Sequence, residues 1–247
     1  MLRMKISLLW FRRTLLAVLF LFGAAWLWAQ GAQWLLRLRA EKLLTDIRSL
    51  KVNRSSWADT QKLMSKWGGY RGVCTAQHCQ YGVHFEHSIP RFLIGYPDKG
   101  VSNWLPRLVT RLGLRSSAVG AEFTVENGLV TETDFFEYVV LPVQTWISPE
   151  GAFQSDLYVS SGEVNKGPWY GLEYVPLHSN RTARMNKFGL HVHFFPEENP
   201  SEKELLMNFR FNCITQINPC LREDEILLEG WRLLQEEQAN PISKHLR

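Results

Sequence analysis

Histidines and carboxylates are the side chains in this sequence with the chemistry for proton transfer or metal binding. His191 and His193 stand two residues apart in LHVHFFP, so on a β-strand both rings project from one face, as a pair of metal ligands requires. That face lies opposite Leu190 and Val192. We therefore interpret the two rings as a histidine pair on the solvent side of a sheet, and we assign no residue to a metal or a cofactor.

Five acids lie around a predicted hairpin: Glu122, Glu126, Glu132, Asp134 and Glu137. They have the chemistry of paired carboxylates, but we interpret them as the solvated face of a sheet. The sequence has no G-x-S-x-G, Walker, H-E-x-x-H or Rossmann glycine motif, so catalytic residues remain unknown. An enzyme would need two members of a larger set within hydrogen-bond reach in a concave site: His84, His87, His178, His191 and Asp134. A binding module would instead expose an apolar patch or an open sheet edge.

The four cysteines form two close pairs. Cys74 and Cys79 stand in CTAQHC, and Cys213 and Cys220 stand in CITQINPC. Even numbers at short spacing favour disulfides in an oxidising compartment, with zinc binding and free thiols as the alternatives. Neither pair has the C-x2-C spacing of common zinc sites, and His78 is the only further donor near the first. Short loops close most often, which favours pairing within each segment, while a link between the two segments stays open.

An apolar segment near the N-terminus is long enough to span a bilayer. Thr14–Leu36 contains 23 residues without a charge, which as a helix extend about 34 Å against a hydrocarbon core of about 30 Å. Three tryptophans lie toward its far end, as indoles do at membrane interfaces. A signal peptide cleaved near Ala29-Gln30-Gly31 is the alternative. Leucines after the segment keep helical spacing, which favours an uncleaved anchor.

Charge is distributed unevenly along the chain. The first 39 residues hold six of the 28 basic residues and no acid, so the remainder is slightly acidic, which argues against nucleic acid as a partner. Basic residues flank the apolar segment on both sides, and the cysteines therefore decide the orientation. We predict a basic cytoplasmic tail at 1–13, a transmembrane anchor at 14–36 that contacts the lipid bilayer, and an exocytoplasmic strand-rich domain at 37–247.

Hydrophobic periodicity predicts short helices around a strand-rich centre. Ser56 and Asp59 open a helix over about 56–67, and Asn127-Gly128 joins two strands through a type I′ turn. Asn218-Pro219 opens a last helix. The remaining predicted strands are 80–86, 153–160, 170–177, 189–195 and 205–213. No long helix separates successive strands, so the prediction is an α+β fold with an antiparallel sheet. It comprises an N-terminal transmembrane helix followed by a mainly antiparallel β domain bracketed by short helices.

Residues 43–69, LLTDIRSLKVNRSSWADTQKLMSKWGG, resemble the paired-helix opening of small envelope domains related to the outer-membrane lipoproteins of the bacterial barrel-assembly machinery. The whole chain is similar to uncharacterised single-pass envelope proteins of soil bacteria, with the same order of anchor, helix and cysteine-flanked strand. The chain lacks the lipobox cysteine of the lipoproteins. The resemblance implies a non-enzymatic envelope domain that binds other proteins.

We therefore expect a membrane-anchored, extracytoplasmic binding or scaffolding domain in the cell envelope, with other envelope proteins as its partners. The alternative is an envelope hydrolase with a histidine and carboxylate site.

Overall fold

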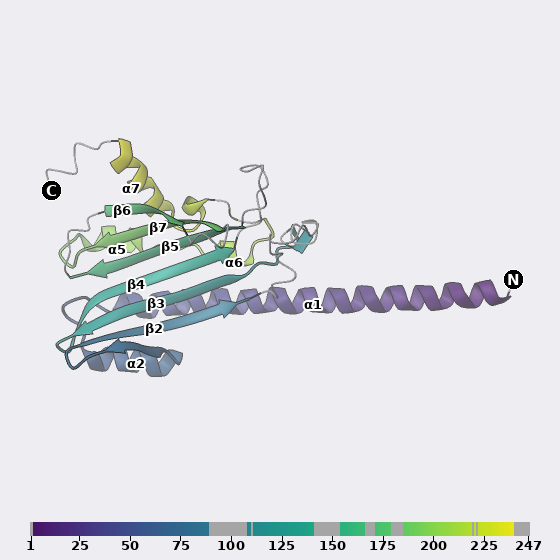
Figure 1. Ribbon diagram of the computed structural model, residues 1–247, viewed down its shortest axis with the longest axis horizontal. Helices are drawn as coiled ribbons and strands as arrows, with labels where there is room; N and C mark the ends of the chain where they lie inside the picture. The colour runs from purple at the N-terminus through teal and green to yellow at the C-terminus, as the bar shows by residue number, and fades with distance from the viewer. Residues whose placement is uncertain are drawn as a thin grey trace.

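A single long helix enters a domain built on one β-sheet (Figure 1). The computed structural model describes residues 2–88, 108–109, 111–140, 154–165, 171–178, 185–218, 220 and 222–239. Helix α1 (Leu2–Ser49) has 48 residues and so extends about 72 Å. From Trp10 onward it is long and apolar enough to cross a membrane, and the most apolar part is not buried in the domain.

The C-terminal half of α1 belongs to the domain. Leu36, Ala40, Leu43 and Ile47 follow helical spacing, and all four are buried. This stripe packs on a sheet whose facing residues include Val119, Phe123, Phe135 and Leu190. The apolar N-terminal segment and the core helix are therefore one continuous element.

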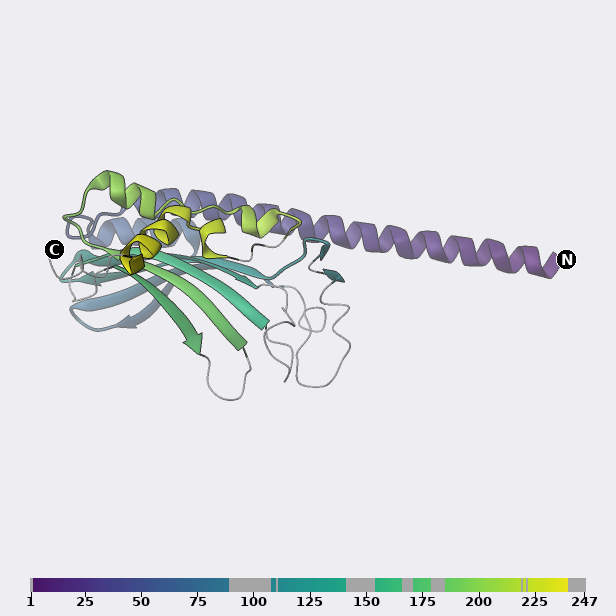
Figure 2. The same cartoon turned by 90° about the horizontal axis from the view of Figure 1, so that it is seen from above.

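The sheet has seven strands in the order β1-β2-β3-β4-β5-β7-β6. Their bounds are β1 Tyr70–Cys74, β2 His78–His87, β3 Ser117–Glu126, β4 Leu129–Val140, β5 Gln154–Val164, β6 Gly171–His178 and β7 Met185–Phe194. All the described helices lie on one side of this sheet (Figure 2): α1, α2 (Trp57–Trp67), α5 (Pro200–Leu206), α6 (Asn212–Thr215) and α7 (Leu228–Ala239). Its other face carries no helix from the described part of the chain.

The sheet is mainly antiparallel, as predicted, but it is mixed because one pair of strands is parallel. Five neighbouring pairs are antiparallel, but β5 and β7 run parallel, with Ser160 opposite His191. The parallel pair needs no crossover helix, because β6 occupies the edge and β7 returns between β6 and β5. The α+β class itself is confirmed.

Two local predictions agree with the structure. Helix α2 begins with a capping box in which Ser56 and Asp59 bond each other's backbone, and it ends at Gly68 in the left-handed conformation. Asn127 and Gly128 both have positive φ, 50° and 83°, as a type I′ turn requires. Turn and cap chemistry depends on adjacent residues alone, so the sequence determines it.

The predicted strand 205–213 is wrong. Its alternation is real, since Met207, Phe209, Phe211 and Cys213 are buried. Leu205 and Leu206 instead end α5, Asn212 and Cys213 begin α6, and residues 207–211 link the two helices. In this link, the Arg210 N–H donates to the Ile226 carbonyl at 2.8 Å. Alternating apolar and polar residues indicate an extended segment with one buried side. A connecting segment packed on the core has the same pattern as a strand.

The predicted C-terminal helix begins later than expected. Glu223–Glu225 form a separate 3-10 turn, η2, and α7 then starts at Leu228. Ile226 and Leu227 between them are fully buried. Pro219 lies outside the described residues.

Candidate functional site

The sheet face away from the helices brings polar and aromatic side chains from different strands into rows. Strand register places His84 beside Gly120, Gly120 beside Phe136, Phe136 beside Ser160, and Ser160 beside His191. A parallel row contains Glu122, Asp134, Gly162 and His193. Residues from four or five strands therefore meet on one surface, which we call the open face.

Glycines on this face leave room for rings. A Cβ at Gly120 would lie 2.3 Å from Cζ of Phe136, and one at Gly82 would lie 2.4 Å from Cζ of Tyr70. Both distances are far below van der Waals contact, so each ring lies across a backbone that has no side chain. The glycines thereby hold the aromatic rings close to the sheet.

A cavity of about 440 Å³ opens on this face. Its aromatic lining consists of Phe136, Tyr138 and Tyr158, with His84 and Glu86 as polar members. The rings of Phe136 and Tyr158 are stacked at 5.9 Å between centroids. This volume and composition are typical of sites for small ligands.

Behind the cavity, Ser160 is the centre of a buried polar network. Its hydroxyl contacts Nδ1 of His191 and also hydrogen-bonds with Asp134 and Tyr158. His191 Nε2 in turn lies 3.2 Å from Nδ1 of His193. Tyr158 belongs to both sets, so the network is continuous with the cavity wall.

The fold perturbs the acid-base chemistry of this network. Burial raises the pKa of Asp134 well above its usual range, and Glu122 adds to this shift. Burial, followed by the neighbouring His193, lowers the pKa of His191 to about 3. The pKa of Tyr158 is raised, first by burial and then by Asp134. Neutral imidazole is thus the form of His191 at physiological pH.

The hydrogen bonds of this chain can run in two directions. With Asp134 protonated, Asp134 donates to Ser160, Ser160 to His191, and His191 to His193. With Asp134 ionised, each bond reverses and Ser160 donates to the carboxylate. This series of hydrogen bonds from Asp134 to His193 can therefore hold or relay a proton. Ser160 is fully buried, so its oxygen does not reach solvent as a nucleophile.

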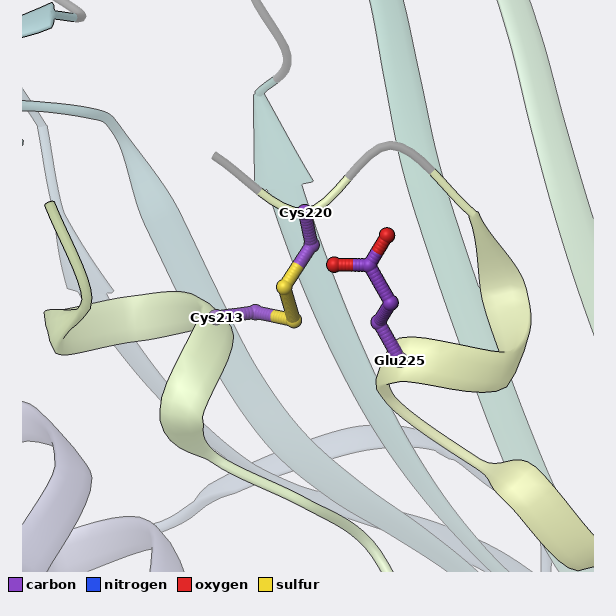
Figure 3. Close-up of side chains that lie close together, drawn as sticks. All are labelled: Cys213, Cys220 and Glu225. Atoms are coloured by element: carbon purple, nitrogen blue, oxygen red, sulfur yellow. A yellow bond between two sulfur atoms is a disulfide. The ribbon is translucent and has the colours of Figure 1, made fainter. Parts of the chain in front are cut away.

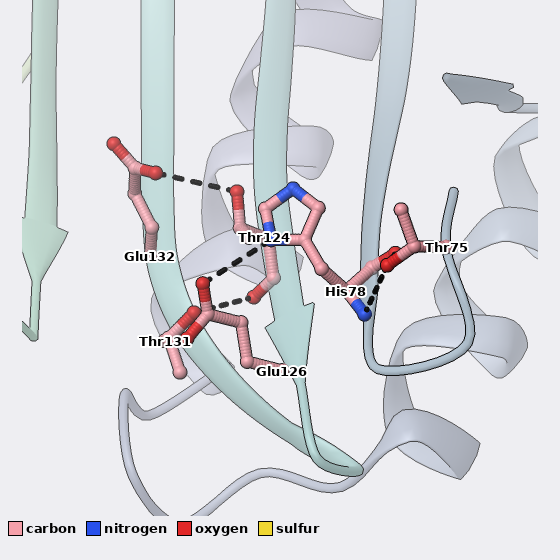
Figure 4. A network of polar contacts seen from close by, with 6 residues as sticks. All are labelled: Thr75, His78, Thr124, Glu126, Thr131 and Glu132. Carbon is pink, nitrogen blue, oxygen red and sulfur yellow. Dashed lines mark hydrogen bonds and ion pairs between the residues drawn. The ribbon is translucent and has the colours of Figure 1, made fainter. Parts of the chain in front are cut away.

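The hairpin acids are not all solvated. At the turn end of the sheet, Glu126 contacts Nδ1 of His78 at 3.2 Å, and Glu132 accepts from the Thr124 hydroxyl at 3.2 Å (Figure 4). Two of the five acids contradict the predicted solvated face. Asp134 belongs to the buried polar network described above, and the second is Glu137. It points into the core, it is fully buried, and neither carboxylate oxygen has a hydrogen-bond partner among the described residues. Burial raises the pKa of Glu137 well above its usual range.

The other predicted histidines do not join the network. His84 lines the cavity, whereas His87 is half-buried and its Nε2 has no partner in the described part of the chain. The side chain of His178 lies outside the described residues. Of the proposed catalytic set, the structure connects only Asp134 and His191, through Ser160.

Both disulfides are local. Cys74 pairs with Cys79 beside the β1–β2 turn, and Cys213 pairs with Cys220 (Figure 3). A carboxylate oxygen of Glu225 lies within 4.8 Å of both sulfurs of the second pair. Sulfurs joined to each other are not thiolate ligands, so in this state the group does not form a metal site.

A larger cavity, of about 700 Å³, lies between the end of α1, β5 and α5. Lys203 Nζ bonds to Oε1 of Glu163 there at 2.6 Å, and both side chains are largely buried. This pair links α5 to the sheet, and the charges lining the cavity have both signs. We regard the cavity as a structural junction.

No known protein family, curated protein or solved structure matches this chain. Two central members of the site, Ser160 and Tyr158, escaped prediction from sequence. They fall within the predicted strand 153–160, but nothing local indicates that this strand lies beside His191. A serine in a strand carries no signal until its partner strand is known.

Proposed function

We propose that this protein is a membrane-anchored, extracytoplasmic binding domain whose ligand occupies the cavity on the open face. The observation that carries the proposal is the cavity itself, which has an aromatic wall and an adjoining buried polar network. Aromatic rings held on glycines supply a rigid apolar contact surface. His84 and Glu86 supply polar groups for orientation.

Two features support the anchored, outward placement. α1 continues without a break from an apolar segment into the domain core, so the domain and the anchor move as one body. Two disulfides suit an oxidising compartment. Other envelope proteins are the partners that such a placement brings within reach.

The test is a ligand-observed NMR screen of aromatic and heterocyclic fragments against the full chain in detergent. We expect fragments that bind the wild type to lose binding in Tyr138→Ser, which removes one wall of the cavity. Tyr70→Ser is the matched control, because Tyr70 is half exposed on the same face but outside the cavity. Binding that Tyr138→Ser leaves unchanged, or no binding at all, would contradict the proposal.

A hydrolase remains the second candidate, because Ser160 contacts a histidine and an acid. Such an enzyme would require Ser160 to become exposed on substrate binding. A panel of chromogenic esters tests this possibility, with Ser160→Ala as the variant. Turnover by the wild type that Ser160→Ala abolishes would establish the enzyme, and turnover equal in both would exclude this serine.

A further inference from the structure

The domain forms hydrogen bonds to α1 within the apolar segment Thr14–Leu36. Nε1 of Trp26 donates to the Leu112 carbonyl at 2.9 Å, and Nε2 of Gln30 lies 3.3 Å from the carbonyl oxygens of both Leu112 and Gly113. Both donors belong to the uncharged stretch Thr14–Leu36. The anchor and the domain therefore overlap along the helix.

The length of the apolar segment gives the depth of these contacts in a bilayer. If the hydrocarbon core starts near Thr14, directly after Arg12 and Arg13, its far boundary lies about 20 residues later, close to Trp34. Gln30 is four residues before that point, which places its contacts about 6 Å inside the boundary. If Arg12 and Arg13 lie inside the near boundary and reach back to the headgroups, the helix shifts along its axis and these contacts move outward into the interfacial layer.

Two large apolar side chains are exposed at this level. Ile217 is 58% exposed and Leu108 is 43% exposed. Ile217 sits in the loop that the Cys213–Cys220 disulfide closes, and Arg115 donates to its carbonyl at 3.0 Å. A Cβ at Gly113 would lie 3.1 Å from Cα of Ile217, so the two loops touch. Figures 1 and 2 show α6, which precedes this loop, at the end of the domain from which α1 emerges.

Five backbone carbonyls in the described part of this end accept hydrogen bonds from side chains. A carbonyl without a partner is costly in a bilayer, and Trp26 and Gln30 satisfy those of Leu112 and Gly113. Arg115 likewise bonds the carbonyls of Cys213, Gln216 and Ile217. Side chains of α1 and of Arg115 thus satisfy carbonyls in two loops, as an environment with little water requires.

We infer that this end of the domain, the tip formed by Leu108, Leu112, Gly113 and Ile217, is inserted into the bilayer interface and contacts lipid directly. The inference rests on the proposed anchor and adds a second membrane contact made by the domain. Two contacts on one rigid body fix the orientation of the open face relative to the membrane. Arg111, exposed beside the tip, extends to the headgroups.

Site-specific photocrosslinking to lipid tests the inference. p-Benzoylphenylalanine replaces Ile217 or Leu108 in the full chain, which is reconstituted in vesicles of phosphatidylcholine and phosphatidylglycerol. Leu129 and Leu205 are the matched controls, since each is 43% exposed and lies on the β3–β4 turn or on α5, at the opposite end of the domain. The same probe at Leu19, in the middle of the apolar segment, reports on the anchor.

After irradiation, mass spectrometry counts lipid adducts. We expect adducts at Ile217 and Leu108 in about tenfold excess over Leu129 and Leu205, because of these four positions only the two at the tip reach the lipid. Adducts at Leu19 without an excess at the tip would overturn the inference and leave the anchor intact. Absence of adducts at Leu19 would overturn the anchor and the inference with it.

Discussion

At the scale of residues, the fold shifts the pKa values of two side chains in opposite directions, and the two side chains lie on opposite faces of the sheet. His191 belongs to the polar network on the open face, and Glu137 faces the helices. Burial lowers the pKa of the histidine and raises that of the carboxyl, because in both cases it disfavours the charged form. Each shift makes the stability of the protein depend on pH.

For His191 the dependence lies on the acid side. Its pKa is about 3 in the folded protein and about 6.5 when unfolded, so its contribution to stability is present above pH 6.5 and is lost progressively as the pH falls toward 3. His191→Gln should remove this loss, which is about 5 kcal/mol over that range at about 1.4 kcal/mol per pH unit. Urea unfolding at several pH values measures it. His84→Gln, on the same face but exposed, should keep the wild-type slope, and equal slopes in all three proteins would refute the assignment.

For Glu137 the dependence has the opposite sign. Its pKa is raised in the folded state, so its contribution is complete below the ordinary value and is lost as the pH rises through the raised one. Glu137→Gln cannot ionise, and it should therefore gain more stability over the wild type at pH 8 than at pH 5. Thermal melts at the two pH values decide this. Glu204→Gln, exposed on α5, serves as the control, and a gain by Glu137→Gln that is equal at the two pH values would contradict the shift.

At the scale of elements, what sequence predicts is what neighbouring residues determine. The α2 cap, the Asn127-Gly128 turn and the alternation of β4 depend on a few consecutive positions. The parallel pairing of β5 with β7 depends on residues about 30 positions apart, and it alone brings Ser160 to His191. The sequence therefore allowed His191 and Asp134 to be named as candidates, but it did not predict that Ser160 connects them.

The hairpin turn allows a direct check of an element. Gly128 has φ of 83°, and a Cβ added there would meet no atom within 4 Å, so only backbone strain opposes substitution. Gly128→Val should destabilise the domain by about 1 kcal/mol or more, whereas Gly128→Asn should cost much less, because asparagine tolerates this conformation. Melting temperatures compare the two variants. Equal melting temperatures for the valine and asparagine variants would show that the turn does not need positive φ.

The Cys213–Cys220 disulfide stabilises the loop that carries Ile217. Replacing both cysteines with serine should reduce the free energy of unfolding by about 2.5 kcal/mol on the chain-entropy model for a loop of about eight residues. Chemical denaturation measures this loss. Non-reducing peptide mapping of the wild type is the control for the pairing, and a fragment that joins the Cys74 region to the Cys213 region would contradict it.

At the scale of the whole molecule, one helix joins an apolar N-terminal segment to the sheet that carries the site. α1 is continuous and its second half is buried in the core, so in the proposed anchored placement the helix fixes the distance of the cavity from the membrane. A ligand would therefore meet the open face at a constant height above the bilayer.

Protease accessibility of the full chain in sealed right-side-out membrane vesicles tests the central claim, the anchored and outward-facing domain, most directly. The protein carries one epitope tag at each terminus, and the vesicles are treated with protease before and after carbonate washing. We predict that the protein stays in the membrane pellet, that the C-terminal tag is lost to external protease, and that the N-terminal tag is protected. A soluble species beginning near Ala32, or a C-terminal tag protected in intact vesicles, would contradict the account.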